Sequence, residues 1–196
     1  MIRAIIFDIG GVLVDHDNSK MLARLQTLLE RPPSLAELTR LAFDHGVETG
    51  ELPVQHVFDR LVQTYGSTAS QQDWIDAWTC HFSGKPEMED FVLNAVVPQL
   101  PCHICSNNNA VHWDHVRRTY PIFAPFQKVY LSQELGLAKP DRAIFDLMAR
   151  ELNGAQDILF VDDRADNVEA AKASGFLGHT FTRRDAFERH LQTLGL

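Results

Sequence analysis

A chain of 196 residues, of which 45% are hydrophobic, can bury one substantial core, or one core and a small appended domain. Its formal net charge of −8 argues against non-specific nucleic-acid binding, which needs Lys and Arg to replace phosphate counterions. No apolar run approaches the length of a membrane-spanning helix, and the first residues lack the long apolar stretch of a signal peptide, so no membrane partner is expected.

The first predicted element is a short apolar strand over residues 4–7. Asp8 follows this strand directly, and the pair Gly10-Gly11 then predicts a turn. An acidic residue in such a place is often only a turn or capping residue. Whether Asp8 has a functional role therefore depends on which other side chains the fold places near it.

Residues 17–85 have a helical pattern. In the first part of this segment, leucines recur at three- and four-residue spacing between residues 22 and 29. Residues that cap or open helices mark three further helix starts, at Ser34, Pro53 and Ser70. A segment of this length exceeds an ordinary loop, so it predicts an inserted helical domain.

After residue 85 the pattern changes to alternating strands and helices. Strands are predicted at residues 103–105, 129–131 and 158–161, helices are predicted from Pro86, after Asn109, from Pro140 and from about Ala165, and a last strand and helix close the chain. This alternation predicts an α/β fold, a Rossmann-like parallel sheet with helices on both faces. Residues 1–16 and 86–196 would form this core, and residues 17–85 would form the inserted helical domain.

The three cysteines are a sparse, odd-numbered set, which suits a reducing cytoplasm. Cys102 and Cys105 have a spacing that metal and redox sites use, but the chain has no second half for such a site. Because both lie in a predicted strand, their thiols should point to opposite faces of the sheet. We therefore expect ordinary strand residues in a cytoplasmic protein.

Polar residues at the predicted strand ends indicate where chemistry takes place. In open parallel sheets, ligands bind beyond the carboxyl ends of the strands. Three strand ends, together with a lysine that precedes a predicted helix, supply the polar side chains. These residues are Asp8, Ser106, Asn107, Lys139, Asp162 and Asp163.

This set of residue types suits phosphoryl transfer. The carboxylate of Asp8 can attack phosphorus and form an aspartyl phosphate. A carboxylate and a phosphate repel each other by about 4 kcal/mol per charge pair at 4 Å and an effective dielectric of 20, which a cation relieves. Mg²⁺ prefers such oxygen ligands and takes one or two carboxylates, for which Asp8, Asp163 and the Gly10 carbonyl are candidates. Lys139 alone would be interpreted as a surface lysine, and only the combination gives it a role at the phosphate.

Four segments, in this order, resemble the motifs of the haloacid dehalogenase-like hydrolase superfamily. They are residues 7–13, 104–107, 135–141 and 160–167, with the sequences FDIGGVL, ICSN, LGLAKPD and FVDDRADN. The inserted helical segment is similar to the cap of that family. Two more stretches, YLSQELGL at 130–137 and ETGE at 48–51, resemble the branch that includes α-D-glucose-1-phosphate phosphatase and related sugar-phosphate phosphatases.

The resemblance implies a Mg²⁺-dependent phosphatase that acts on a small phosphorylated metabolite, with Asp8 as the nucleophile. The implied phosphate-binding residues are Ser106, Asn107 and Lys139. The implied metal ligands are Asp8, the Gly10 carbonyl and Asp163. Asp162 and Asn167 would orient these ligands from behind.

One position departs from the family pattern. Most phosphatases of this superfamily carry a second Asp two residues after the nucleophile as general acid and base, but this chain has Gly10 there. Such a catalyst contributes about 10²–10⁴-fold in rate. Asp15, His16 and Asp17 lie at the entrance to the cap and can substitute for it, although capping or solvation explains each of them equally well. Residues that can face the substrate from the cap are Phe43, Asp44, His45 and Glu48.

Two other functions remain open. A metal-free 2-haloacid dehalogenase of the same fold also uses an Asp nucleophile without an acid two residues later, but such enzymes lack the pair Asp162-Asp163. A non-catalytic protein that binds a phosphorylated metabolite is also compatible with Gly10. In each case we expect a small-molecule ligand, no nucleic acid, and a monomer or weak dimer.

Overall fold

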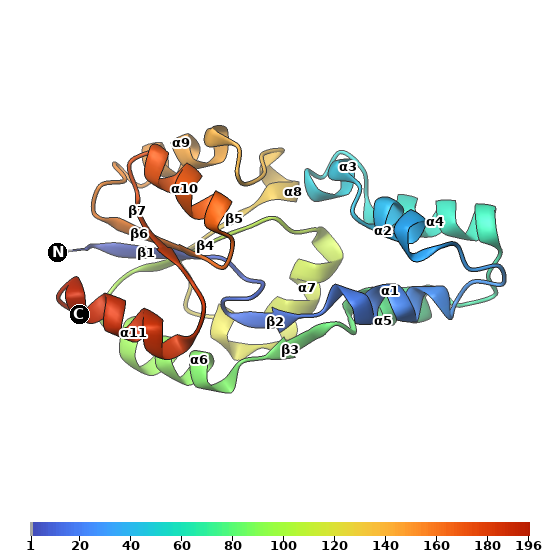
Figure 1. The fold of residues 1–196 in the computed structure, drawn as a ribbon, viewed down its shortest axis with the longest axis horizontal. Coiled ribbons are helices and arrows are strands. Elements are labelled where there is room, and N and C mark those ends of the chain that lie inside the picture. The colour runs from blue at the N-terminus through green and yellow to red at the C-terminus, as the bar shows by residue number, and fades with distance from the viewer. Residues whose placement is uncertain (1) are drawn as a thin grey trace.

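The computed structural model describes residues 2–196 and contains the predicted parallel sheet. Its five strands are in the order β5-β4-β1-β6-β7 (Figure 1). The strands are β1 (Ala4–Phe7), β4 (Cys102–Ser106), β5 (Lys128–Leu131), β6 (Ile158–Asp162) and β7 (Leu177–Thr180). Because β1 is central and pairs in parallel with both β4 and β6, the residue that follows it emerges at the middle of the sheet edge.

Helices cover both faces of the sheet, as the alternation of elements predicts (Figure 1). One face carries α6 (Pro86–Phe91) with the π-helical turn that follows it, α7 (Ala110–Thr119) and α11 (Arg184–Thr193). The other face carries α9 (Arg142–Glu151) and α10 (Ala165–Ala173). Side chains of β1 alternate between the two cores, since Ile5 packs with the first set of helices and Ile6 with the second.

The two strand cysteines follow the same alternation. Cys102 belongs to the core on the α6, α7 and α11 face, and Cys105 to the core on the α9 and α10 face. Both are buried free thiols. The expectation that they are strand residues on opposite faces is confirmed.

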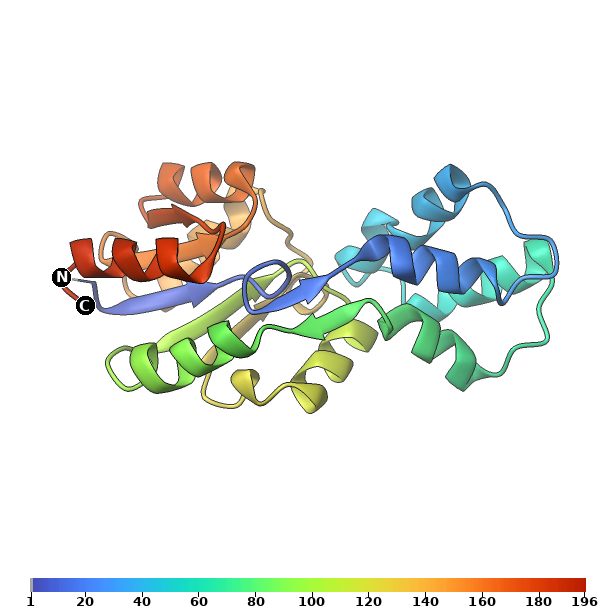
Figure 2. The ribbon, with the colours of Figure 1, turned by 60° about the horizontal axis from the view of Figure 1, so that its bottom comes forward.

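The inserted segment, called the cap below, folds into helices around a core of its own. Its helices are α1 (Asn18–Gln26), α2 (Leu35–Ala42), α3 (His45–Glu48), α4 (Val54–Tyr65) and α5 (Gln71–Thr79). Fully buried side chains such as Leu25, Leu38 and Trp78 fill the space between them. Figure 2 shows the cap and the sheet domain as two lobes. The short helix α3 was not predicted, because four residues are too few to show a periodic pattern.

A two-stranded antiparallel ribbon joins the lobes (Figure 2). It consists of β2 (Val14–His16) and β3 (Phe82–Gly84), with His16 opposite Phe82. Strands of three residues are too short for alternation to predict them, so this ribbon is not among the predicted elements. The predicted division of the chain at residues 16/17 and 85/86 remains a proposal, and the ribbon lies beside both positions.

The predicted helix starts in the cap agree with the structure. Ser34 and Ser70 cap α2 and α5, and Pro53 directly precedes α4. The prediction that a helix starts at Pro140 was wrong, since α9 begins at Arg142. The side chain of Asp141 accepts a hydrogen bond from the Ala143 N–H, 2.9 Å away, and so sets the later start. None of the helices within residues 2–196 is long and apolar enough to cross a membrane.

The stacked pair His179 and His190 predicts that the protein loses stability in mild acid. Their ring centroids lie 4.6 Å apart, and burial, aided by His190, lowers the pKa of His179 to about 4 from its ordinary value of 6.5. Between these two pH values the unfolded chain binds more protons than the folded one, so the free energy of unfolding should fall as the pH falls. Urea unfolding across this window should show a shallower pH dependence for His179→Gln than for wild type. His56→Gln, an exposed change on α4, is the matched control, and equal slopes in all three proteins would contradict the assignment.

Candidate active site

Asp8 lies at the carboxyl end of β1, at the floor of a cavity of about 590 Å³ between the sheet domain and the cap. Its backbone N–H donates to the Val161 carbonyl at 2.8 Å, which continues the pairing with β6 by one residue. The Oδ1 atom accepts from the Ile9 N–H at 2.7 Å and lies 3.0 Å from Lys139 Nζ. Among residues 2–196, Oδ2 therefore has no hydrogen-bond donor and is the carboxylate oxygen that is available to a ligand.

Lys139 is buried between two carboxylates rather than exposed at the surface. Its ammonium group lies 2.6 Å from Asp162 Oδ2 and 3.0 Å from Asp8 Oδ1, and it donates to the Cys105 carbonyl at 3.0 Å. Only 1% of its side chain is accessible to solvent. Burial opposes charge on this lysine, but Asp8 and Asp162 outweigh burial and raise its pKa. The ammonium group therefore stays charged and directly adjacent to Asp8.

Asp162 is fully buried behind the cavity and is saturated with hydrogen bonds. Asn167 Nδ2 donates to both of its oxygens at 3.0 Å, and the Arg164 N–H donates to Oδ1 at 2.9 Å. Together with the ion pair to Lys139, these contacts leave Asp162 little capacity for another ligand. The geometry suits a support that holds Lys139 and the start of α10 in place.

Ser106 is the last residue of β4 and Asn107 follows it, so both lie at the end of the strand as predicted, and both line the cavity. The side chain of Asn107, however, pairs with the backbone of Lys139. Its Nδ2 donates to the Lys139 carbonyl at 2.8 Å, and its Oδ1 accepts from the Lys139 N–H at 2.7 Å. The Asn107 side chain therefore holds the backbone of Lys139 in place instead of binding a ligand. Of these two residues, Ser106 is the one that can donate a hydrogen bond to a ligand from its side chain.

Carboxylate oxygens of Asp8, Asp162 and Asp163 all lie within 4.8 Å of one another. Burial raises the pKa of Asp8 and of Asp163, and the neighbouring Asp162 raises both further. A Cβ atom on Gly11 would lie only 2.3 Å from Asp163 Oδ2, so glycine is needed there for Asp163 to pack against the turn. Hard oxygen donors that repel one another fit a site for Mg²⁺. Since Asp162 is saturated, Asp8 and Asp163 are the carboxylates that can hold the ion.

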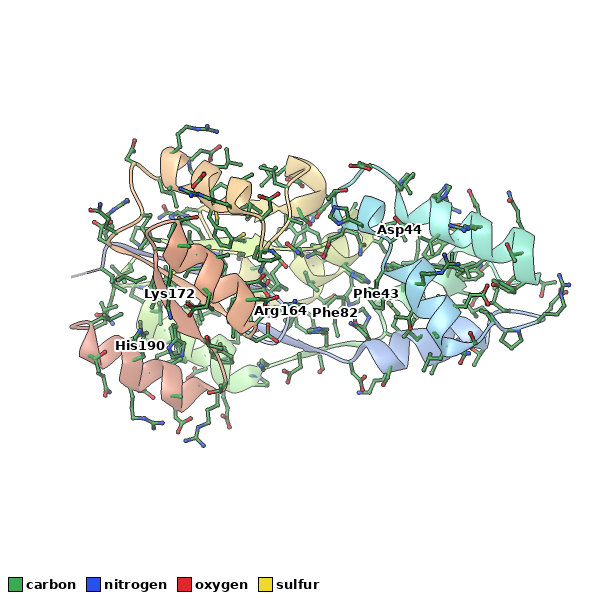
Figure 3. All side chains as sticks on the ribbon, turned by 45° about the horizontal axis from the view of Figure 1, so that its top comes forward. Phe43, Asp44, Phe82, Arg164, Lys172 and His190 are labelled. Carbon is green, nitrogen blue, oxygen red and sulfur yellow. The ribbon has the colours of Figure 1, made fainter. Side chains whose placement is uncertain are left out.

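The cavity is bounded by the cap on one side and by the sheet domain on the other. Phe43, Asp44 and Glu48 line it from the cap, Arg164 lines it from the sheet domain, and Phe82 lines it from the ribbon β2–β3. In Figure 3, Phe82 lies between Arg164 on one side and Phe43 and Asp44 on the other. His45 does not line the cavity, and its side chain is 75% exposed. Substrate contact from the cap is thus available to the residues beside His45 rather than to His45 itself.

The three candidates at the cap entrance have different surroundings. Asp15 forms an ion pair with Lys85 at 2.9 Å. Asp17 caps α1, where its Oδ1 accepts from the Ser19 N–H at 3.1 Å. Of the three, only His16 lines the cavity that contains Asp8.

Ser132 connects the cap to the carboxyl edge of the sheet. It lies within the stretch 130–137, but no role was predicted for it from the sequence. This fully buried residue donates from Oγ to the Glu48 carbonyl at 2.6 Å and accepts from the Asn108 N–H at 2.9 Å. Next to it, a Cβ atom on Gly50 would lie 2.1 Å from the Gln133 carbonyl oxygen. The stretches 48–51 and 130–137, noticed separately in the sequence, therefore contact each other. In the sequence, this contact is indicated only by the resemblance of both stretches to the same branch of the family.

The sequence profile described as haloacid dehalogenase-like hydrolase matches residues 2–175. A curated protein, the D-ribitol-5-phosphate phosphatase of Bacteroides thetaiotaomicron, is 27% identical in an alignment of 186 residues that covers 90% of this chain and 90% of the relative.

Two solved structures are similar over nearly the whole chain. The HAD family enzyme bt-2542 of Bacteroides thetaiotaomicron, in complex with magnesium and inorganic phosphate, superimposes with a TM-score of 0.81 at 22% identity, covering 93% of this chain and 95% of the other. A predicted HAD-like family hydrolase of Porphyromonas gingivalis has a TM-score of 0.81 at 25% identity and covers 97% and 98%.

Proposed function

This chain belongs to the haloacid dehalogenase-like hydrolase family, and we propose that within it the chain is a Mg²⁺-dependent phosphatase that hydrolyses a small phosphate monoester. The observation that carries this proposal is the meeting of Asp8, Lys139 and Asp163 on the floor of one cavity. The buried Asp8 carboxylate there has one oxygen without a donor, and its other oxygen lies 3.0 Å from the buried ammonium group of Lys139. This arrangement suits attack on an anionic phosphorus centre.

In the first step, one carboxylate oxygen of Asp8 bonds to phosphorus while the ester bond between phosphorus and the leaving oxygen breaks. The electron pair of that bond stays on the leaving oxygen, which becomes an alcohol by taking a proton from solvent. In the second step, a water oxygen bonds to phosphorus while the bond between phosphorus and the Asp8 oxygen breaks. The electron pair of that bond returns to the Asp8 carboxylate, a proton of the attacking water passes to solvent, and inorganic phosphate leaves. Lys139 and the Ser106 hydroxyl hold phosphate oxygens during both steps, and Lys139 also holds Asp8 in place through Oδ1.

Asp8 and Asp163, with the carbonyl of Gly10, are the groups that we propose to hold Mg²⁺. When bound, the ion supplies positive charge that offsets the repulsion between the Asp8 carboxylate and the phosphate. The magnesium and phosphate in the similar bt-2542 structure support this choice of ion.

The substrate that we propose is a phosphorylated sugar or sugar alcohol. A relative that matches over 90% of the chain is named for D-ribitol-5-phosphate. The cap lines its side of the cavity with Asp44 and Glu48, which can accept hydrogen bonds from hydroxyl groups, and with the aromatic ring of Phe43. Two carboxylates there disfavour a leaving group that carries a second negative charge.

Phosphate release from a panel of esters tests this function. The panel contains D-ribitol 5-phosphate, glucose 1-phosphate, glucose 6-phosphate, glycerol 3-phosphate and p-nitrophenyl phosphate, each with Mg²⁺ and with EDTA. We expect release that needs Mg²⁺ and is fastest on a sugar or polyol phosphate. If no ester is hydrolysed by folded protein, the proposal fails. Halide release from 2-haloacids in EDTA would then indicate the dehalogenase, and binding of phosphate esters without turnover would indicate the non-catalytic protein.

The metal site predicts that Mg²⁺ stabilises the folded protein. A cation between Asp8 and Asp163 relieves their repulsion and binds only the folded state. At about ten times its dissociation constant it should raise the melting temperature by about 3–5 °C. Asp163→Asn should lose most of this rise, whereas Asp146→Asn, an exposed change on α9, should keep it. A rise of the same size in the Asp163 variant would exclude Asp163 as a ligand.

A further inference from the structure

The glycine at position 10 leaves room for the imidazole ring of His16. A Cβ atom built on Gly10 would lie 2.9 Å from Nδ1 and 3.0 Å from Cε1 of His16, which is closer than real Cβ atoms approach other atoms. A side chain at position 10 would therefore require the His16 ring to move from its observed position. The ring occupies the space into which a side chain two residues after the nucleophile would extend.

The backbone holds this ring in place. The chain turns back on itself after Asp8, because the Val14 N–H donates to the Ile9 carbonyl at 3.0 Å and the Gly11 N–H donates to the Val14 carbonyl at 2.8 Å. Residue 16 then pairs with Phe82 in the ribbon β2–β3. A residue in a strand pair is held more rigidly than one in a free loop, so the backbone of His16 is fixed beside the cavity that its ring lines.

The position of the ring matches the side of the cavity where the leaving group departs. Lys139 lies against Asp8 at the sheet, on the side where the phosphate is held. In an in-line displacement the leaving oxygen lies opposite the attacking oxygen, which is on the side of the cap. His16 lies in the ribbon between the sheet domain and the cap and lines the same cavity as Asp8.

We propose that His16 is a catalytic residue whose ring N–H donates a hydrogen bond to the leaving-group oxygen of the phosphate ester. This inference rests on the proposed phosphatase function. As the bond between phosphorus and that oxygen breaks, the electron pair stays on the oxygen, and the N–H stabilises the negative charge until a proton arrives from solvent. A donor placed in advance where charge develops is worth about 10²–10³-fold in rate.

Two other polar groups that line the cavity, His112 and Arg164, have partners elsewhere. Both ring nitrogens of His112 have partners, at 2.9 Å to Asn109 and at 3.0 Å to the Trp78 carbonyl. The guanidinium group of Arg164 is paired with Asp166 at 2.6 Å. His81 also lines the cavity, and its Nδ1 has no hydrogen-bond partner within residues 2–196, but only 3% of its surface is exposed, whereas His16 is exposed.

The carboxylates nearest to His16 in the chain are also excluded. Asp15 is paired with Lys85, and Asp17 caps α1. Asp44 and Glu48, which line the cavity from the cap, offer acceptors rather than donors when ionised. His16 is exposed to the cavity and adjacent to the catalytic turn.

The test compares an ester that needs help with its leaving group and one that does not. The p-nitrophenolate ion is a stable leaving group, whereas the alkoxide of a sugar or polyol is not. We expect His16→Ala to lower kcat/KM for the best sugar or polyol phosphate of the panel by about 10²-fold, and for p-nitrophenyl phosphate by less than about fivefold. His16→Gln keeps an N–H donor and should recover about tenfold of the loss on the sugar or polyol phosphate. His56→Ala, an exposed histidine on α4, should leave both rates unchanged.

A second pair of variants tests the shared space directly. Gly10→Asp alone should displace the His16 ring, since its Cβ would lie 2.9 Å from His16 Nδ1, and should lower turnover of the sugar phosphate. In Gly10→Asp/His16→Ala the collision is removed and a carboxyl group takes the place of the ring. Turnover of the sugar phosphate should then exceed that of His16→Ala.

Three outcomes would overturn the proposal. One is an equal loss on both esters with a higher Mg²⁺ requirement, which would assign the ring to the metal site through its neighbour Asp163. Another is no loss on either ester in His16→Ala. The third is a double variant no better than His16→Ala. Continued hydrolysis of p-nitrophenyl phosphate by wild type in any of these cases would leave the phosphatase function standing, so the two proposals fail separately.

Discussion

Asp8→Asn is expected to lower kcat for every ester by about 10⁴-fold or more, because the amide cannot attack phosphorus. The change is nearly isosteric, and Lys139 keeps its ion pair with Asp162 at 2.6 Å. The variant should therefore fold, with a circular dichroism spectrum and a cooperative urea transition like those of wild type. The measurement is phosphate release at saturating Mg²⁺ for the best sugar phosphate and for p-nitrophenyl phosphate.

Two further observations make this result specific for nucleophilic attack. Wild type that is quenched in acid during turnover should carry a phosphoryl group on the peptide that contains Asp8, whereas Asp8→Asn should carry none. Asp146→Asn, an exposed change on α9, serves as control and should retain full activity. If Asp8→Asn lost less than about tenfold, which is far below the loss typical of a nucleophile, another group would have to attack.

Lys139→Met is expected to abolish activity and also to lower the free energy of unfolding by about 3–5 kcal/mol, since it removes one partner of a buried ion pair. The ammonium group lies 3.0 Å from Asp8 and 2.6 Å from Asp162, and the three side chains are almost completely shielded from solvent. Without the cation, two buried carboxylates face each other. Urea unfolding near neutral pH measures the loss.

The pH dependence of this variant distinguishes charge burial from loss of packing. Burial already raises the pKa of Asp8, and removal of Lys139 takes away the attraction that opposes this rise. A carboxyl group whose folded pKa lies above its unfolded value binds more protons in the folded state. Stability is therefore regained as the pH falls through the folded pKa. The deficit of Lys139→Met relative to wild type should shrink toward acidic pH, whereas a packing defect would persist.

A compensating change completes the experiment. Lys139→Met/Asp162→Asn removes one of the two uncompensated charges, and it should recover part of the lost unfolding free energy without recovering activity. The control Lys172→Met removes an exposed lysine of α10 and should leave the free energy of unfolding within about 0.5 kcal/mol of wild type. Recovery of phosphate release in the double variant would show that Lys139 has no part in catalysis.

Much of the fold could be predicted because its signals are local. An apolar run followed by a polar residue indicates a buried parallel strand and its end, and this pattern identified the predicted strands. Ser34 and Ser70 marked helix starts through their own side chains. The ribbon β2–β3 and the helix α3 were missed, since three or four residues carry no periodic signal and are stabilised by their partners.

The candidate site also has a part that the sequence predicts and a part that it does not. The sequence by itself determined which residues lie at the strand ends, namely Asp8, Ser106 and Asp162, because a parallel topology brings the carboxyl ends of its strands to one edge. It did not determine which of the side chains at that edge contact a ligand and which hold other residues in place. Asn107 was predicted to bind phosphate, yet its amide is bound to the Lys139 backbone.

The direction in which each side chain points was decided only by the tertiary structure. Asp15, His16 and Asp17 are neighbours in the chain and equal candidates by composition, but Lys85 neutralises the first and the start of α1 uses the last. Only the ring of His16 lies over Gly10. Lys139 is buried because carboxylates from two separate strands surround it. Such roles depend on electrostatic and steric contacts between segments distant in the sequence, which no local pattern contains.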